Sequence, residues 1–185
     1  DFWLAFVGRT LLIFSYYMIL NYQLYILEMY IGQGKKAAAA TISVMSVITM
    51  IVGLVGSLAS GAISDKIGRR KVPVIVASFL LALGYFLPWV MKSPSSMMLF
   101  AGFAGLGYAV YGAVDQALNV DVLPSKKEAG KDLGIINVAT TLGQTAGPIV
   151  TSALVDAAGY QLVFPVAIAF AIIACVFIQM IRCTK

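Results

Sequence analysis

The sequence contains no histidine and only two cysteines among its 185 residues. Without histidine, imidazole metal sites and the Ser-His or Cys-His pairs of nucleophilic enzymes are excluded. Cys175 and Cys183 fall in one apolar run, where a helical rise would separate them by about 12 Å, too far for a disulfide. The sequence also has no paired-acid motif. We therefore expect no metal site, no cofactor and no enzymatic activity.

Charged residues are also scarce, because they make up 11% of the chain while hydrophobic residues make up 61%. In soluble domains about a quarter of the residues are charged. The mean hydropathy of +0.92 therefore indicates that the protein is embedded in lipid. The net charge of +5 does not indicate a nucleic-acid partner, since the basic residues form short clusters beside apolar runs. That placement is typical of membrane orientation signals.

Six apolar runs are each long enough to cross the hydrocarbon core, which takes about 20 helical residues. Short segments containing glycine, proline, serine or charged residues separate them. The runs cover residues 2–31, 37–60, 72–91, 96–123, 133–155 and 160–181. The sequence thus predicts an all-α integral membrane protein in which residues 1–185 form one domain of six transmembrane helices.

The distribution of lysine and arginine predicts the orientation of these helices. One side of the membrane receives nine basic residues: Lys66, Arg69, Arg70, Lys71, Lys126, Lys127, Lys131, Arg182 and Lys185. The other side receives three: Lys35, Lys36 and Lys92. Because cytoplasmic loops collect lysine and arginine, we expect both ends of this segment to face the cytoplasm.

Polar side chains recur inside the runs, where each needs a partner or a water-filled cavity. At about 100° per residue they align on faces of the first, fourth and fifth helices. On the first helix they form two neighbouring stripes, the second of which also includes Thr10 and Tyr17. The residues that we expect to line a substrate or proton pathway are Arg9, Tyr16, Asn21, Gln23, Tyr108, Tyr111, Asp115, Asn119, Asn137 and Gln144.

Arg9 and Asp115 lie in the same half of their predicted helices, so they are placed to meet. One interpretation is a structural ion pair that only joins two helices. The other is a cavity pair that gates the pathway, binds substrate or carries the coupling charge. We favour the second, because both residues share faces with tyrosines and amides rather than with small packing residues.

Small residues on two other helices predict close helix contacts. Gly143 and Gly147, followed by Pro148, allow close approach and a kink in the fifth helix. The second helix has a stripe of small residues, which we interpret as a packing face. Its members are Ser46, Thr49, Gly53, Gly56 and Ser60.

The segment GAISDKIGRRK, from Gly61 to Lys71, places one acid and four bases between the second and third runs. Such a cluster cannot lie in hydrocarbon, so we expect a tight loop at one membrane face. The pattern G-x-x-x-D-(R/K)-x-G-R-(R/K) resembles the loop signature of the major facilitator superfamily at every defined position. Those positions are Gly61, Asp65, Lys66, Gly68, Arg69 and Arg70.

The resemblance implies one half of a twelve-helix transporter, because the signature follows the second helix of each half in that superfamily. The leading segment, with Phe2, Trp3, Arg9, Tyr22 and Tyr25, looks like the seventh helix of some bacterial facilitator proteins. We therefore expect the C-terminal half, helices 7–12, with the N-terminal half missing from this segment.

The resemblance also implies a conformational latch at the cytoplasmic ends of the helices. In this family the acid of the motif caps the penultimate helix of its half, and the arginine pairs with an acid at the end of the fourth. Here these roles fall to Asp65, Arg69 and Asp121. A carboxylate near a helix N-terminus is favoured by the helix dipole, which supports the first of these contacts.

The function implied is that of a secondary active transporter in the plasma membrane, with a small solute, a coupling proton and the lipid bilayer as partners. A wall of tyrosine, asparagine and glutamine suits a hydroxyl-rich solute, so we expect sugar–proton symport with Asp115 as the candidate proton carrier. A drug–proton antiporter and a non-transporting membrane sensor on the same fold remain open alternatives.

Overall fold

The structure, a computed structural model, describes the backbone of residues 2–67, 71–121 and 129–181; the side chains of residues 61–71 and 116–129 fall outside the described part. The secondary structure of the described residues is helical, as predicted. In chain order the elements are α1 (Phe2–Leu20), α2 (Gln23–Tyr25), the π-helical turn η1 (Ile26–Tyr30), α3 (Lys35–Ile67), α4 (Lys71–Met91), α5 (Pro94–Asp121), α6 (Ala129–Ala158), the 3-10 turn η3 (Tyr160–Leu162) and α7 (Val163–Gln179).

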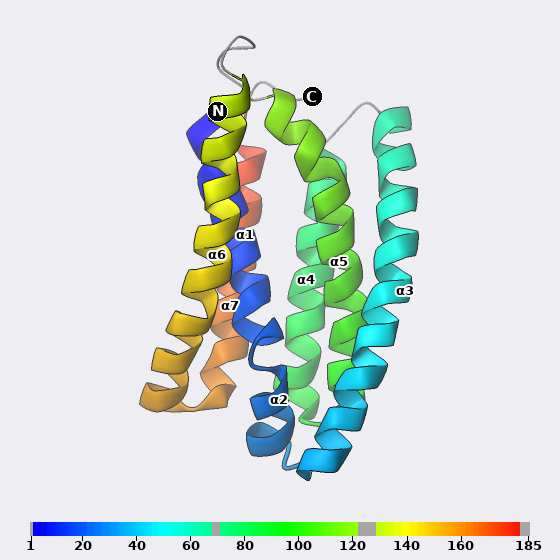
Figure 1. Cartoon of the computed structure of the whole chain (residues 1–185), viewed down its shortest axis with the longest axis vertical. Helices are drawn as coiled ribbons and strands as arrows, with labels where there is room; N and C mark the ends of the chain where they lie inside the picture. The colour runs from blue at the N-terminus through cyan, green and yellow to red at the C-terminus, as the bar shows by residue number, and fades with distance from the viewer. Residues whose placement is uncertain (1, 68–70, 122–128, 182–185) are drawn as a thin grey trace.

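The long helices stand side by side, and both ends of the chain lie at the same end of the bundle (Figure 1). Within the described residues, five helices are long and apolar enough to cross a membrane: Phe2–Leu20, Lys35–Ser60, Val72–Met91, Pro94–Asp115 and Tyr160–Gln179. The sixth, α6, is long enough but carries Asn137, Gln144 and several threonines along its centre, which lower its hydropathy. The predicted six-helix membrane architecture is confirmed, with α6 as its most polar member.

The first apolar run, expected to be one helix, is interrupted near its end. α1 stops at Leu20, and residues 21 and 22 form a turn before α2 and η1 continue. At the turn the Tyr22 amide donates to the Ile19 carbonyl at 3.1 Å, a tighter pairing than the four-residue spacing of an α-helix. Asn21 is a weak helix former with an exposed side chain, which accounts for a break at this point.

The segment of the basic motif also differs from expectation. Residues 61–67, predicted to belong to a tight loop, continue α3 to Ile67, and α4 begins at Lys71. A helix can extend past the hydrocarbon core without cost, because its backbone groups remain paired within the helix.

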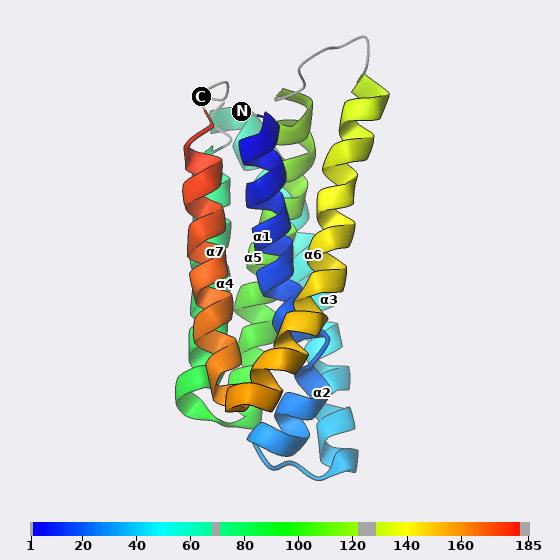
Figure 2. The ribbon, with the colours of Figure 1, turned by 90° about the vertical axis from the view of Figure 1, so that its left-hand side faces the viewer.

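The helices pack in two groups of three. α1 packs between α6 and α7 (Figure 2), and α5 packs in the same way between α3 and α4. α4 also contacts α7 and joins the groups, whereas α1 and α5 touch at only a few points. Any polar contact between α1 and α5 therefore spans the boundary between the two groups.

The predicted close approach at Gly143 and Gly147 is confirmed, and its partner is α1. A Cβ atom on Gly143 would lie 2.9 Å from both the Phe14 nitrogen and the Thr10 carbonyl oxygen. One turn beyond Gly147, the Thr151 hydroxyl donates to the Met18 carbonyl at 3.0 Å. This contact fixes which side of α6 faces α1.

The small-residue stripe of α3 is a packing face only in part. A Cβ atom on Gly56 would lie 2.6 Å from the Leu106 side chain of α5, whereas Gly53 has no other group within 4 Å. Thr49 also faces α5, because its hydroxyl donates to the Ala101 carbonyl at 3.5 Å.

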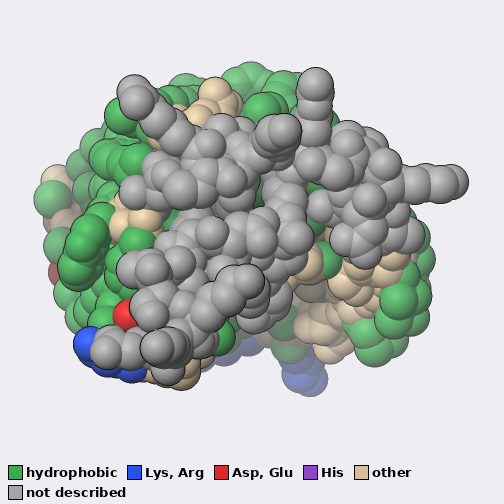
Figure 3. All heavy atoms as spheres, turned by 90° about the horizontal axis from the view of Figure 1, so that it is seen from above, with side chains coloured by type: hydrophobic (Ala, Val, Ile, Leu, Met, Phe, Trp, Pro, Cys, Tyr) green, Lys and Arg blue, Asp and Glu red, His purple; other side chains and the backbone are tan. Residues whose placement is uncertain are grey.

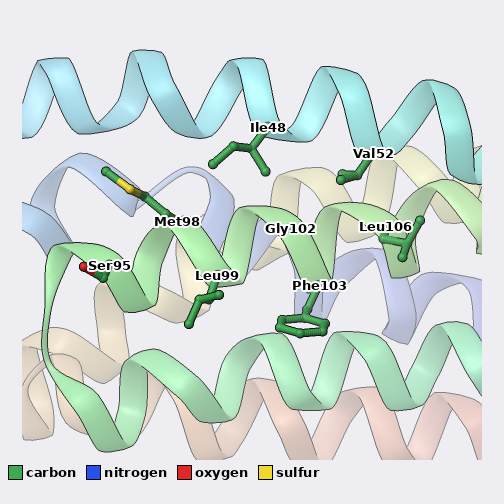
Figure 4. A pocket seen from close by; sticks show the side chains of 8 residues that line it. All are labelled: Ile48, Val52, Ser95, Met98, Leu99, Gly102, Phe103 and Leu106. Atoms are coloured by element: carbon green, nitrogen blue, oxygen red, sulfur yellow. The ribbon is translucent and has the colours of Figure 1, made fainter.

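The outer surface of the bundle is strongly apolar. Seen from the end that carries the termini, hydrophobic side chains surround much of the molecule (Figure 3). A groove of about 570 Å³ runs along α5 and is lined by residues of α3 and α5 (Figure 4). Its lining residues are Ile48, Val52, Ser95, Met98, Leu99, Gly102, Phe103 and Leu106. A groove of this composition suits contact with lipid chains rather than with a polar solute.

Candidate substrate and proton pathway

An ion pair at membrane depth joins α1 to α5. Nη1 of Arg9 donates to Oδ2 of Asp115, and the two side chains are only 7% and 5% exposed. The contact expected from the positions of these residues is therefore present. It is the one salt bridge in which both side chains belong to the described part of the chain.

Two further side chains complete this cluster. The Tyr111 hydroxyl, one turn before Asp115 on α5, donates to Oδ1 of the carboxylate at 2.6 Å. Nε of Arg9 donates to the Thr140 hydroxyl on α6 at 2.9 Å. The cluster of Arg9, Tyr111, Asp115 and Thr140 thus links α1, α5 and α6 across the boundary between the helix groups.

Sequence reasoning missed Thr140. The polar face predicted for the fifth helix from Asn137 and Gln144 also includes the neighbouring Thr141 at about 100° per residue, and Thr141 is exposed in the structure. The close contact at Gly143 rotates α6 so that Thr140 rather than Thr141 approaches Arg9. A buried guanidinium requires hydrogen-bond acceptors, so the sequence could have predicted that a hydroxyl group of a neighbouring helix contacts Arg9. It could not have identified Thr140 as the residue that supplies it.

The energetics of this cluster make it sensitive to charge. An ionised side chain at the centre of a bilayer costs at least about 2.5–3.5 kcal/mol, so each member of the pair depends on the other. Both carboxylate oxygens of Asp115 accept hydrogen bonds, which is the condition for a stable buried pair. If Asp115 took up a proton, the ionic attraction would vanish and Arg9 would keep only a neutral acceptor at this site.

Next to this cluster lies an aromatic wall. Tyr16 and Tyr108 stack with their ring centroids 4.3 Å apart and their planes inclined by 8°. Tyr17 meets the edge of Tyr108 at 6.3 Å, and its hydroxyl accepts a hydrogen bond from Nε2 of Gln144 at 3.1 Å. Within this wall Tyr16 is buried, whereas Tyr17, Tyr108 and Gln144 are half-buried, so part of each of these three side chains is exposed.

The other residues predicted for the pathway lie apart from these two groups. Asn21 is exposed at the turn after α1, and Asn137 is exposed on α6. Gln23 lines a separate cavity of about 340 Å³ beside α3, together with Met45 and Thr49. The side chain of Asn119 lies outside the described part of the structure.

The residues of the predicted latch also fall outside the described side chains. They are Gly61, Asp65, Lys66, Gly68, Arg69, Arg70 and Asp121. Their contacts therefore remain a prediction from the motif.

The fold and the buried polar cluster define a helical, multi-pass membrane protein with a polar boundary between two helix groups. The sequence profile of the Major Facilitator Superfamily matches residues 9–182, nearly the whole chain. This chain therefore belongs to the Major Facilitator Superfamily, a family of membrane transporters.

Curated relatives include the "Probable 4-methylmuconolactone transporter" of Cupriavidus pinatubonensis, 25% identical over 143 residues, which are 77% of this chain and 33% of that protein. "Multidrug resistance protein Stp" of Mycobacterium tuberculosis is 29% identical over 107 residues, 58% of this chain and 20% of that protein. The chain thus spans about a third or less of the length of these relatives.

A solved POT family transporter in complex with 5-aminolevulinic acid has the same fold, with a TM-score of 0.82 at 16% identity. The match covers 97% of this chain and 37% of that one.

Proposed function

We propose that this chain is the C-terminal six-helix half of a proton-coupled secondary transporter, which moves a small solute by alternating access. The observation that carries this proposal is the buried Arg9–Asp115 pair, held between the two helix groups by Tyr111 and Thr140. In transporters, substrate and coupling-ion sites typically lie near the bilayer midplane at the interface between structural repeats. In this proposal Asp115 carries the coupling proton. The strength of the Arg9 contact changes with the charge of the Asp115 carboxylate.

The aromatic wall supports an uncharged solute that combines hydroxyl groups with a flat face. Tyr17, Tyr108 and Gln144 together offer ring surfaces, hydroxyl groups and an amide, but no formal charge. A sugar has matching chemistry, because it hydrogen-bonds to amides and stacks on rings. We therefore propose first that the substrate is a sugar and that the proton gradient drives its transport into the cell.

A drug–proton antiporter is the second candidate. It is supported by the 29% identity to "Multidrug resistance protein Stp" and by the same aromatic wall, which also suits flat apolar compounds. A non-transporting sensor on this fold is less well supported. A sensor would not require a buried charged pair, because leucine at both positions would avoid the cost of desolvating two charges.

In the proposed topology both ends of the segment face the cytoplasm and the loops at Lys35 and Lys92 face outside, in the plasma membrane. The nine-to-three distribution of basic residues supports this orientation. The remaining length of the relatives supports a second, N-terminal half that would complete the cavity.

The test is a solute screen on the full-length transporter in proteoliposomes. An inward proton gradient should drive accumulation of a labelled sugar and should fail to do so after a protonophore is added. Extrusion of a cationic dye against its gradient, without sugar accumulation, would favour antiport. Absence of both, in protein that is folded and correctly inserted, would refute the proposed function and favour the sensor.

A further inference from the structure

α2 and the last turns of α6 lie at the end of the bundle opposite the termini (Figure 1). Residues of α2, of the turn before it, of α6 and of η3 line a small pocket there. Its volume is about 240 Å³. The lining residues are Tyr22, Tyr25, Ser152, Val155, Asp156 and Tyr160. We call this site the tyrosine pocket.

Three tyrosines and one carboxylate line the same pocket. The rings of Tyr22 and Tyr25 have centroids 5.7 Å apart and planes inclined by 45°, so they form two walls of a corner rather than a closed stack. The hydroxyl groups of Tyr22 and Tyr25 and the carboxylate of Asp156 lie close enough to the Tyr160 hydroxyl to influence it electrostatically. An aromatic ring attracts a cation placed over its face within about 6 Å of its centroid.

The pocket carries negative charge without a basic counterpart. Asp156 is exposed, no lining residue is basic, and no salt bridge among the described side chains involves Asp156. A carboxylate beside several tyrosine rings is the combination that recognises organic ammonium ions, because the rings replace part of the hydration of the cation.

The size of the pocket limits the ligand. Sites for drug-sized molecules usually enclose about 300–1,000 Å³, and this pocket is smaller. A compact head group such as a quaternary or alkyl ammonium fits that volume, whereas a multi-ring drug does not.

The pocket also continues the polar side of α6. At about 100° per residue, Thr141, Thr145, Ser152 and Asp156 lie within about 60° of one another around that helix, and these side chains are exposed. Polar side chains at membrane depth need a partner or a water-filled cavity. We therefore include in this proposal that this exposed side of α6 also borders the pathway, which places the pocket at its mouth.

We propose that the tyrosine pocket binds a small organic ammonium ion at the outer mouth of the transporter, through the rings of Tyr22, Tyr25 and Tyr160 and the carboxylate of Asp156. The position at the mouth rests on the proposed function, whereas binding itself does not. Such a pocket fits the antiport candidate, whose solutes can carry a cationic group, rather than uptake of an uncharged sugar.

Binding of choline to the purified full-length transporter in nanodiscs, measured by isothermal titration calorimetry, tests this proposal. Asp156→Asn and Tyr25→Ala should each weaken choline binding by about 2- to 5-fold. Tyr25→Phe should bind like the native protein, because it retains the ring face. The neutral analogue 3,3-dimethylbutan-1-ol, which has carbon in place of the charged nitrogen, should not bind.

Glu28→Gln is the matched control, since it removes one acid at the same end of the bundle from a side chain outside the pocket. Its choline affinity should equal that of the native protein. Equal binding of the neutral analogue, an unchanged affinity in Asp156→Asn, or no choline binding in protein that elutes as a single monodisperse peak would each overturn the proposal. The binding measurement needs neither a proton gradient nor transport. A transporter that is not coupled to protons would therefore still give a valid test of choline binding to the tyrosine pocket.

Discussion

Replacing Asp115 with asparagine is the sharpest test of the buried cluster, because it removes the charge and keeps the shape. In the native structure the carboxylate accepts hydrogen bonds from Arg9 at one oxygen and from Tyr111 at the other. Asparagine keeps one accepting oxygen for Arg9, and its amide nitrogen can donate to the Tyr111 hydroxyl if that hydroxyl turns. The cluster can therefore stay assembled without its negative charge.

The expected loss of stability is moderate. A hydrogen bond to a charged group contributes about 1.5–3 kcal/mol, and a neutral one contributes about 0.5–1.5 kcal/mol. The Asp115→Asn variant should therefore lose about 1–2 kcal/mol of unfolding free energy. Asp115→Ala, which leaves Arg9 buried without its partner, should lose about 3–5 kcal/mol. The asparagine variant should thus reach the membrane in amounts that permit transport assays, and the alanine variant should not.

The assay compares two modes of transport in proteoliposomes. Accumulation driven by a proton gradient requires that Asp115 gain and lose a proton, whereas exchange of labelled for unlabelled solute requires only the movement of the carrier. Asp115→Asn should abolish accumulation and retain exchange. Arg9→Gln in the same background should raise stability, because it removes the uncompensated charge.

Two results would refute this reasoning. Normal accumulation by Asp115→Asn would show that Asp115 carries no coupling proton. Loss of accumulation, exchange and protein level together, with partial recovery when Arg9 is also neutralised, would show that the pair only holds the helices together.

Three further predictions concern packing, orientation and the latch. Gly143→Ala should lower the unfolding free energy by about 1–3 kcal/mol, because the new methyl group would meet the backbone of α1 at 2.9 Å; thermal denaturation in detergent measures this. In intact cells, an impermeant thiol reagent should label a cysteine placed at Lys35 and leave one at Lys126 unlabelled. Arg69→Ala should shift the conformational equilibrium inward and slow turnover, and its coupling to Asp121 in a double-mutant cycle should be at least ~0.5 kcal/mol.

Each of these predictions has a control or a contrary outcome. Gly134→Ala adds the same methyl group inside α6 where no described atom lies within 4 Å, so it should not lower stability and should raise it by up to about 1 kcal/mol. Labelling must be done in a background without Cys175 and Cys183, and the reverse labelling pattern would overturn the proposed topology. Strictly additive effects of the two latch substitutions would show that Arg69 and Asp121 do not act as a unit.

Part of the site could be predicted from the sequence because the membrane imposes simple requirements. A charged residue at membrane depth needs a partner, and Arg9 and Asp115 were the two ionisable residues at matching depth. Helical periodicity placed Tyr108, Tyr111 and Asp115 on one side of α5. It did not distinguish their contacts: Tyr111 donates to the carboxylate, whereas Tyr108 stacks on Tyr16.

What the sequence by itself determined is the class of structure: all-helical, membrane-spanning and marked by the facilitator motif. The length and hydropathy of a run suffice for this, since backbone groups in lipid must pair within the helix. Three features became known from the three-dimensional arrangement alone: Thr140 contacts Arg9, α1 ends at Leu20, and Asp156 lines one pocket with three tyrosines. These features depend on how each helix is rotated and staggered against its neighbours, and close backbone contacts such as that of Gly143 with α1 set those rotations.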